Sequence, residues 1–448
     1  MISIEFTRLH RALAIALLYL ALLSSFGETW AFGRVALSPY LHHLLESINL
    51  TKETNATTWF QACLLVWCGY LASILARTEE RQSRNGWWVV SWALFFMGMD
   101  EVASVHERTI PLFREMFHGG GLTYFTWVIP GAMLAGLLVS GLVFFSHLHL
   151  ERPFGPITQG ALLFFTGAIG LEMLSALLVD NQGHSQLPYF YVATVEEVFE
   201  SAGALRMAQG LGQLLSEKPR SISPRPVILC GSFAALAAVL TVVGTVLELA
   251  NYFDSESSRF MIELAQFSNI TQERNLPTYL SSMGLLALAW AAWLLSRLES
   301  GGTRSPWAWL SAVFAFLSWD EIATFHERLE GLIRHSLGPL PGPLTRSWIL
   351  VAPLLVILAY RAGKRVSDQF SEENRWRFLF GGFLFVLGTV GLKPLSGWLA
   401  AGQNYPVAFF FLAIFEDSLK FAGCALLLHS VFTRLNDQSN PVELKFVE

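Results

Sequence analysis

The sequence predicts an all-helical (all-α), polytopic integral membrane protein with about twelve transmembrane helices in two parallel six-helix repeats. Three observations lead to this fold class. Of the 448 residues, 53% are hydrophobic and only 15% are charged, with a mean hydropathy of +0.45. Uncharged stretches recur at lengths near the ~20 residues that cross a bilayer. A charged motif and its surroundings occur twice, 220 residues apart.

The composition excludes several classes of protein. Soluble proteins carry roughly 25% charged residues, so the low charge indicates a chain that is inserted in the lipid bilayer. The net charge of −5 and the absence of a basic tail give no sign of nucleic-acid binding. The four cysteines lie inside apolar stretches, which suits small packed side chains better than a disulfide framework or a zinc-ligand spacing.

Twelve apolar segments are candidate transmembrane helices. We expect them at residues 12–32, 58–76, 87–107, 123–147, 158–179, 189–213, 227–252, 278–297, 307–327, 346–363, 376–398 and 406–432. We assign residues 1–220 to the first repeat and 221–448 to the second. Because each repeat holds an even number of spans, both enter the membrane in the same direction.

Lys and Arg residues set the expected orientation. They concentrate in the loops on the side of the N-terminus, which predicts an inner cell-membrane protein with both termini in the cytoplasm. The longest loops on the outer side, 33–57 and 253–277, match each other, and we expect each to carry a short interfacial helix. In number of spans the layout is similar to that of secondary transporters of the major facilitator type.

The most informative stretch is MDEVASVHER, from Met99 to Arg108, which recurs as WDEIATFHER from Trp319 to Arg328. Ionisable residues in apolar helices are costly and therefore mark candidate functional sites. The candidates in the two motifs are Asp100, Glu101, His106 and Glu107, then Asp320, Glu321, His326 and Glu327. Whether the second motif is active cannot be predicted from its residues.

Further carboxylates of the first repeat should lie in the same leaflet. The third span runs outward, so its motif lies at its outer end, while Glu196, Glu197 and Glu200 begin the inward-running sixth span. Glu172 falls in the outer half of the fifth span. Charges that face lipid are expensive, so we expect these groups to face one another or water.

The geometry of a continuous helix limits what the motif can do alone. At about 100° per residue, Asp100 and Glu107 lie on one face, whereas His106 points roughly 120° away from Asp100. A small ion would therefore need ligands from a second helix. Carboxylates and imidazole from facing helices suit Zn, Mn or Mg, and we predict a divalent-metal site. Its expected ligands are Asp100, His106, Glu107, Glu196, Glu197 and Glu200.

Two aligned differences distinguish the repeats. Glu172 corresponds to Lys393 and Glu200 to Lys420, so the second repeat can neutralise its acids by internal ion pairs. The first can do so only by binding a cation, taking up protons or staying hydrated. We therefore expect the active site in the first repeat. The second would be a structural copy or a site for an anionic group.

Three functions fit these observations. The first is proton- or cation-coupled transport of a small solute, in which the acids bind the coupling ion. The second is a membrane-embedded metal-dependent hydrolase or transferase for a lipid-linked substrate, with Glu101 or Glu172 as general base. The third is a non-catalytic membrane subunit. A structural alternative for Glu101 is a salt bridge with Arg108, and for His106 an interfacial hydrogen bond.

Overall fold

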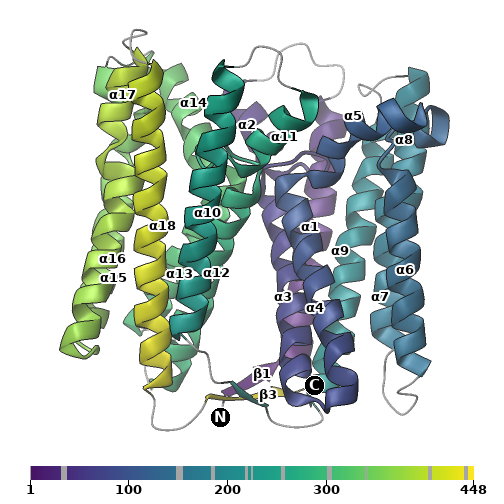
Figure 1. The fold of residues 1–448 in the computed structure, drawn as a ribbon, viewed down its shortest axis with the longest axis horizontal. Coiled ribbons are helices and arrows are strands. Elements are labelled where there is room, and N and C mark those ends of the chain that lie inside the picture. Colours follow the sequence, from purple (N-terminus) through teal and green to yellow (C-terminus); the bar gives the residue numbers. More distant parts are fainter. Residues whose placement is uncertain are drawn as a thin grey trace. The chain divides into compact units, whose positions relative to one another are not determined.

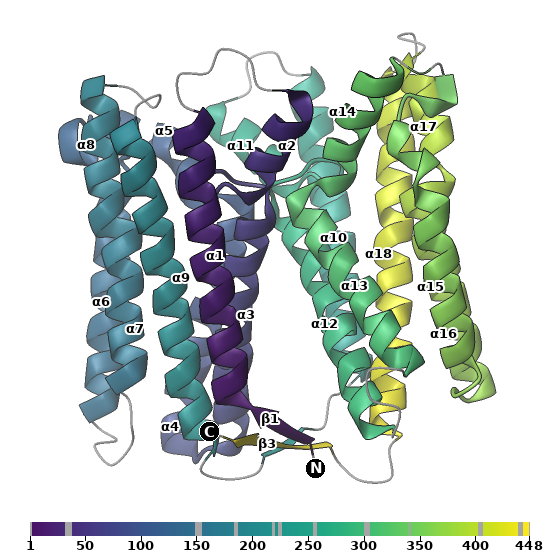
Figure 2. The same ribbon diagram turned by 180° about the vertical axis from the view of Figure 1, so that it is seen from behind.

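A computed structural model describes residues 2–31, 38–147, 155–182, 187–216, 220–222, 226–253, 258–299, 305–338, 340, 342–401, 406–437 and 442–447. The chain divides into two compact units. The first comprises residues 3–222 with 443–448, and the second comprises residues 223–442. Each unit is a set of long helices (Figures 1 and 2).

The first unit begins at strand β1 and ends at strand β2. Its elements are β1 (Ile2–Glu5), α1 (Phe6–Ala31), α2 (Pro39–Ile48), α3 (Ala56–Thr78), α4 (Arg81–Ala103), α5 (Val105–Phe117), η1 (Gly121–Thr123), α6 (Val128–His147), α7 (Gly155–Phe165), η2 (Thr166–Leu171), α8 (Glu172–Gln182), α9 (Leu187–Ser216) and β2 (Arg220–Ile222). Helix α9 packs against α1, α3 and α7, and α3 packs against α4. Helix α4, which carries the first part of the motif, and helix α9, which carries Glu196, Glu197 and Glu200, therefore both pack against α3.

The second unit has the same succession of helices. Its elements are α10 (Pro226–Phe253), α11 (Arg259–Ser268), α12 (Leu276–Leu298), α13 (Pro306–Ala323), α14 (Phe325–Leu337), η4 (Gly342–Leu344), η5 (Ser347–Leu350), α15 (Ala352–Ser367), α16 (Glu372–Val386), η6 (Leu387–Gly391), α17 (Lys393–Ala401) and α18 (Pro406–Asn436). Helix α18 packs against α10, α12 and α16.

Most residues of the twelve expected segments are helical where the structure describes them, but the helices are interrupted at Ser104, 124–127, Thr324, Arg346, Val351 and Leu392. The loops 33–57 and 253–277 also carry short helices, α2 and α11, as expected, although 32–37 and 254–257 lie outside the described residues. Asparagine side chains cap the N-termini of α3 and α12. The Asn55 amide oxygen accepts hydrogen bonds from the backbone N–H groups of Thr57 and Thr58, and that of Asn275 accepts one from Thr278.

Three short strands are the exception to the predicted all-helical fold. Strand β3 (Val442–Val447) lies between β1 and β2 in one small sheet. Its sequence VELKFV alternates apolar and charged residues, which is the period of a strand and not of a helix.

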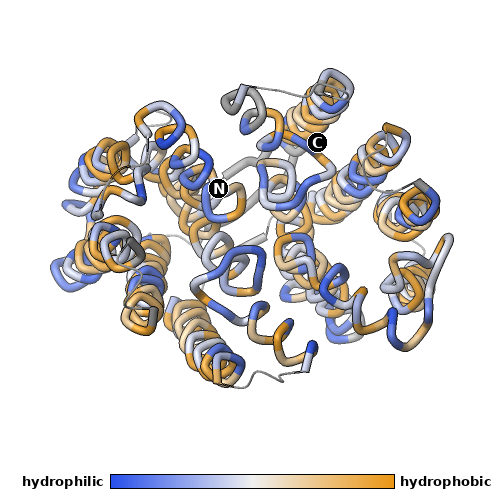
Figure 3. Tube along the Cα trace, turned by 90° about the horizontal axis from the view of Figure 1, so that it is seen from above, coloured by the Kyte–Doolittle hydropathy of each residue, from blue (hydrophilic) through white to orange (hydrophobic). Residues whose placement is uncertain are grey.

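Among the residues that the structure describes, seven helices are long and apolar enough to cross a membrane, or up to eight if the bent pair α4–α5 forms one span. Viewed along the helices, apolar residues line most of their length and hydrophilic ones gather in the end segments (Figure 3). Helices α9 and α18 are long enough, at 30 and 31 residues, but carry the acidic residues. The number of twelve spans stays a prediction.

The expectation of one straight helix over 87–107 is wrong. Helix α4 ends at Ala103 and α5 leaves it at an angle of 81°. Ser104, between them, adopts left-handed backbone angles (φ 47°, ψ 47°). Thr324 does the same between α13 and α14 (φ 49°, ψ 36°). The angular positions predicted for a continuous helix therefore do not apply to His106 and Glu107.

A π-helical turn, η2, interrupts the segment expected as one helix over 158–179. Glycines allow α7 and η2 to approach α9 closely. A Cβ atom added at Gly203 would lie 2.5 Å from the Phe164 backbone nitrogen, and one at Gly167 would lie 2.9 Å from the Glu196 carbonyl oxygen. π-helical turns in helices frequently accompany functional sites, and this one abuts the acidic part of α9.

Candidate functional site

The bend after α4 joins Asp100 to His106. One carboxylate oxygen of Asp100 accepts from the His106 backbone N–H at 2.9 Å and the other lies 2.8 Å from the ring Nδ1. Asp320 holds His326 in the same way, at 2.9 and 3.0 Å. The prediction that His106 points away from Asp100 is wrong, because it assumed a straight helix. A carboxylate at Nδ1 fixes the ring and leaves Nε2 available.

Below the bend, Gln61 links two acids of different helices. Its amide nitrogen donates to Glu200 at 2.7 Å and to Glu101 at 3.2 Å. The Ser201 hydroxyl donates to the amide oxygen of Gln61 at 2.6 Å, which fixes the orientation of the amide group. Gln61, on α3, is 2% exposed, so these bonds form away from bulk water. The amide compensates only part of the charge of two carboxylates.

Glu196 and Glu172 form another part of the cluster. The Ser175 hydroxyl donates to Glu196 at 3.1 Å, and the Trp127 indole donates to Glu172 at 3.1 Å. The two carboxyl groups also interact electrostatically with each other.

Glu197 belongs to the cluster through its electrostatic interactions. It interacts electrostatically with Glu200, Glu53, Glu172 and His106. Glu101 interacts with Glu197, Glu53 and His106 as well. The side chains that donate hydrogen bonds to Glu101, Glu196 and Glu200 are those of Gln61 and Ser175, which are uncharged.

In the second unit, lysines occupy the corresponding positions. Lys420 lies 3.1 Å from Glu321 and 3.3 Å from Asp417, and Lys393 lies 2.8 Å from Glu416. The internal ion pairs expected from the sequence are therefore formed. Ser281 stands where the first unit has Gln61, so the amide is absent where the ammonium is present.

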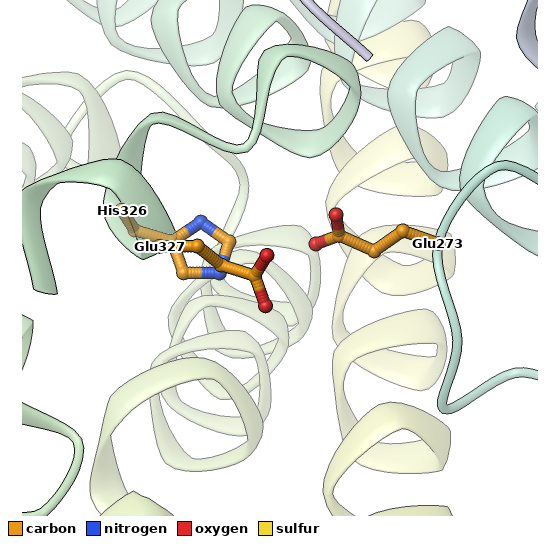
Figure 4. A group of neighbouring side chains, drawn as sticks. All are labelled: Glu273, His326 and Glu327. Carbon is orange, nitrogen blue, oxygen red and sulfur yellow. The ribbon is translucent and has the colours of Figure 1, made fainter. Parts of the chain in front are cut away.

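A second group of titratable side chains lies in the second unit, where Glu273 interacts electrostatically with Lys420. Glu273, His326 and Glu327 each offer a ligand atom, and these atoms lie within 4.8 Å of one another. Figure 4 shows the Glu273 carboxylate facing the side chains of His326 and Glu327 from the opposite side. Glu273 precedes α12, and the other two residues begin α14.

The surroundings of Glu273 and His326 favour the protonated forms of both side chains. Burial, then the charge of Glu327, raises the pKa of Glu273 to about 8 despite the opposing effect of His326. Burial lowers the pKa of His326, but its hydrogen bond to Asp320 and the neighbouring carboxylates outweigh this and raise the pKa to about 9. A divalent cation would replace these protons.

The structure thus brings most of the predicted site residues together. Glu101, His106, Glu172, Glu196, Glu197 and Glu200 form one connected set, Asp100 is bound to His106, and Glu107 interacts with His106 from an exposed position at the start of α5.

Sequence reasoning missed Glu53, Gln61 and Glu273. The signal was present for the two glutamates, because the matching segments ESINLTKET and QFSNITQER place Glu53 and Glu273 220 residues apart. Gln61 had no such signal, since its counterpart is Ser281.

Fold and site together define a helical protein with several membrane-spanning candidates and a carboxylate–histidine cluster. The chain belongs to the family described as a domain of unknown function (DUF8692), whose model matches residues 11–210 and 233–435. No curated protein and no solved structure matches the chain.

Proposed function

We propose that this protein couples the transport of a small solute to protons or a cation that bind in the first unit. In this proposal the chain forms twelve spans in two parallel six-helix repeats, in the inner cell membrane, with both termini in the cytoplasm. The cation lies among Glu101, Glu197 and Glu200, below His106. The second repeat is a scaffold whose corresponding position is filled by a lysine.

The observation that carries the proposal is the ion pairing of Lys420. Its ammonium group is held by Glu321 and Asp417. The residues at these three positions in the first unit are Glu200, Glu101 and Glu197. A positive charge thus fills the acidic site in one unit, and the other has a carboxylate there instead. A site built in this way favours a mobile cation.

The depth of the acids supports transport over a surface role. Glu101 lies at the end of α4, whereas Glu200 lies near the middle of α9, a helix of 30 residues and about 45 Å. The carboxylates therefore extend from the helix ends toward the middle of the unit. Chains of acids at such depth are typical of ion pathways in transporters.

A metal-dependent enzyme acting on a lipid-linked substrate is a second candidate, favoured by the bond between Asp100 and His106. The bond leaves Nε2 of His106 for a metal that would activate water or polarise a phosphoryl or acyl group, with Glu101 or Glu172 as base. Headgroup or fatty-acid release from vesicle lipids in the presence of Zn²⁺, absent in His106→Ala, would favour this candidate.

Proteoliposomes can test transport. Internal pH and Mn²⁺ are followed with dyes while amino acids, sugars and metal ions are presented outside. We expect solute-dependent cation entry that Glu197→Gln abolishes, because the amide cannot bind the ion. Asp417→Asn, the matched change in the second unit, should leave entry intact since Glu321 still holds Lys420. Equal entry in wild type and Glu197→Gln would refute the proposal.

A further inference from the structure

We propose that the second unit binds a divalent metal ion, Zn²⁺ or Mn²⁺, through Glu273, His326 and Glu327. This site is separate from the cation site of the first unit and does not depend on the transport proposal. The sequence had suggested only a structural copy or an anion site here. The metal would fasten the segment before α12 to the start of α14.

The spacing of the three side chains suits such an ion. Their ligand atoms lie within 4.8 Å of one another, and they come from two separate segments that face each other (Figure 4). Zn²⁺ binds imidazole nitrogen and carboxylate oxygen at about 2.0–2.2 Å, so the ligands of a tetrahedral ion lie about 3.4 Å from one another. Side-chain movements of about 1 Å would bring all three ligand atoms into range and leave the fourth position for water.

Asp320 fixes the position of the His326 ring. Asp320 binds Nδ1 of His326 at 3.0 Å and also accepts from its backbone N–H at 2.9 Å. This carboxylate–histidine pair is the arrangement that orients imidazole ligands toward metals and increases their basicity. The left-handed backbone at Thr324 places the histidine back over Asp320.

The donor set selects the class of metal. Imidazole suits Zn²⁺ and its neighbours in the first transition row, whereas Mg²⁺ and Ca²⁺ prefer oxygen ligands alone. Two carboxylates and one imidazole also neutralise a divalent charge, and Lys420 is already held by Glu321 and Asp417. We expect Zn²⁺ to bind more tightly than Mn²⁺, and Mg²⁺ not to compete.

The experiment measures metal per chain in the full-length protein. Protein in detergent is stripped with EDTA, equilibrated with Zn²⁺, desalted and analysed by mass spectrometry, and Co²⁺ absorption is recorded in parallel. His326→Ala and Glu273→Gln should each lose one equivalent relative to wild type. His335→Ala, on the same helix, should lose none, and Glu197→Gln should keep the second-unit metal whatever happens to transport.

Two milder variants guard against a failure to fold. Glu327 is exposed, so Glu327→Gln should still fold, and its Tm should no longer rise when Zn²⁺ is added. Asp320→Asn should weaken Zn²⁺ binding by about 10–100-fold, because Asp320 positions the ring. Equal metal content in wild type and His326→Ala would overturn the proposal. So would an equal loss in His335→Ala, which would mean non-specific binding to surface carboxylates.

Discussion

Nζ of Lys420 lies 3.1 Å from a carboxylate oxygen of Glu321, whereas in the first unit Glu101 and Glu200 share the amide group of Gln61. Corresponding helices thus hold a neutralised site in the second unit and an acidic site in the first. Two replacements account for the difference. Gln61 on α3 corresponds to Ser281 on α12, and Glu200 on α9 corresponds to Lys420 on α18.

Removing the ammonium should destabilise the second unit. Lys420→Met leaves Glu321 and Asp417 close together without their cation, in a site where Lys420 is only 15% exposed. Breaking one partner of a buried ion pair costs about 3–5 kcal/mol, and we expect a loss near the lower value. Lys364→Met, an exposed lysine on α15, is the control and should change little. Detergent unfolding would measure the difference, and equal stability of the two variants would contradict the prediction.

Copying the second site into the first should remove the need for a bound cation. In the double variant Gln61→Ser/Glu200→Lys, the new ammonium would lie beside Glu101 and Glu197. We expect a higher Tm than wild type in cation-free buffer and, in a Glu273→Gln background that lacks the second-unit metal site, no further rise with added Mn²⁺. Solute-dependent flux should be lost. A response to Mn²⁺ that persists in this background would show that the cation of the first unit binds elsewhere.

Much of the fold could be predicted from the sequence, because hydrophobic segments and the paired motif are local signals. The lysines that replace Glu172 and Glu200 likewise revealed the difference between the units before any coordinates did. The bend at Ser104 could not be predicted. Serine has no special preference for left-handed angles, and the bend is stabilised by the contact of Asp100 with the His106 backbone. The angular analysis of the motif failed for that reason.

The partners within the site were equally hidden from sequence. Gln61 is an ordinary helical residue until α3 packs between α4 and α9, and then it contacts acids 40 and 139 residues away. Such a contact depends on tertiary packing, which cannot be predicted from the hydrophobic periodicity of the sequence. Glu53 was hidden for a different reason, since it lies in a loop segment where an acid is unremarkable.

The metal-free second unit should become less stable as the pH rises. The pKa of Glu273 is raised from 4.5 to about 8, and that of His326 from 6.5 to about 9. A raised pKa in the fold gives stability that is complete below the unfolded value and is lost as pH passes the folded value. Stability should therefore fall between about pH 4.5 and 9. Stabilisation by Zn²⁺ should grow over the same range, because protons compete for its ligands.

Tm measured with EDTA and with Zn²⁺ from pH 5 to 9 checks this prediction. The double variant Glu273→Gln/His326→Gln removes both titrating groups and is the control, so its Tm should depend less on pH in either buffer. A metal-free Tm that rises with pH in wild type would contradict the assigned direction.

The close approach of α7 and α9 should be needed for the acidic site. In Gly203→Val the new Cβ would lie 2.5 Å from the Phe164 backbone nitrogen, which a side-chain rotation cannot relieve. The helices must separate, at a cost of about 1–3 kcal/mol, and Glu196 and Glu200 on the same helix move with them. Gly136→Val on α6 is the matched control, since nothing lies within 4 Å of its Cβ. We expect Gly203→Val to lower both Tm and cation-dependent flux and Gly136→Val to lower neither. Unchanged flux in Gly203→Val would mean that the acids do not need this packing.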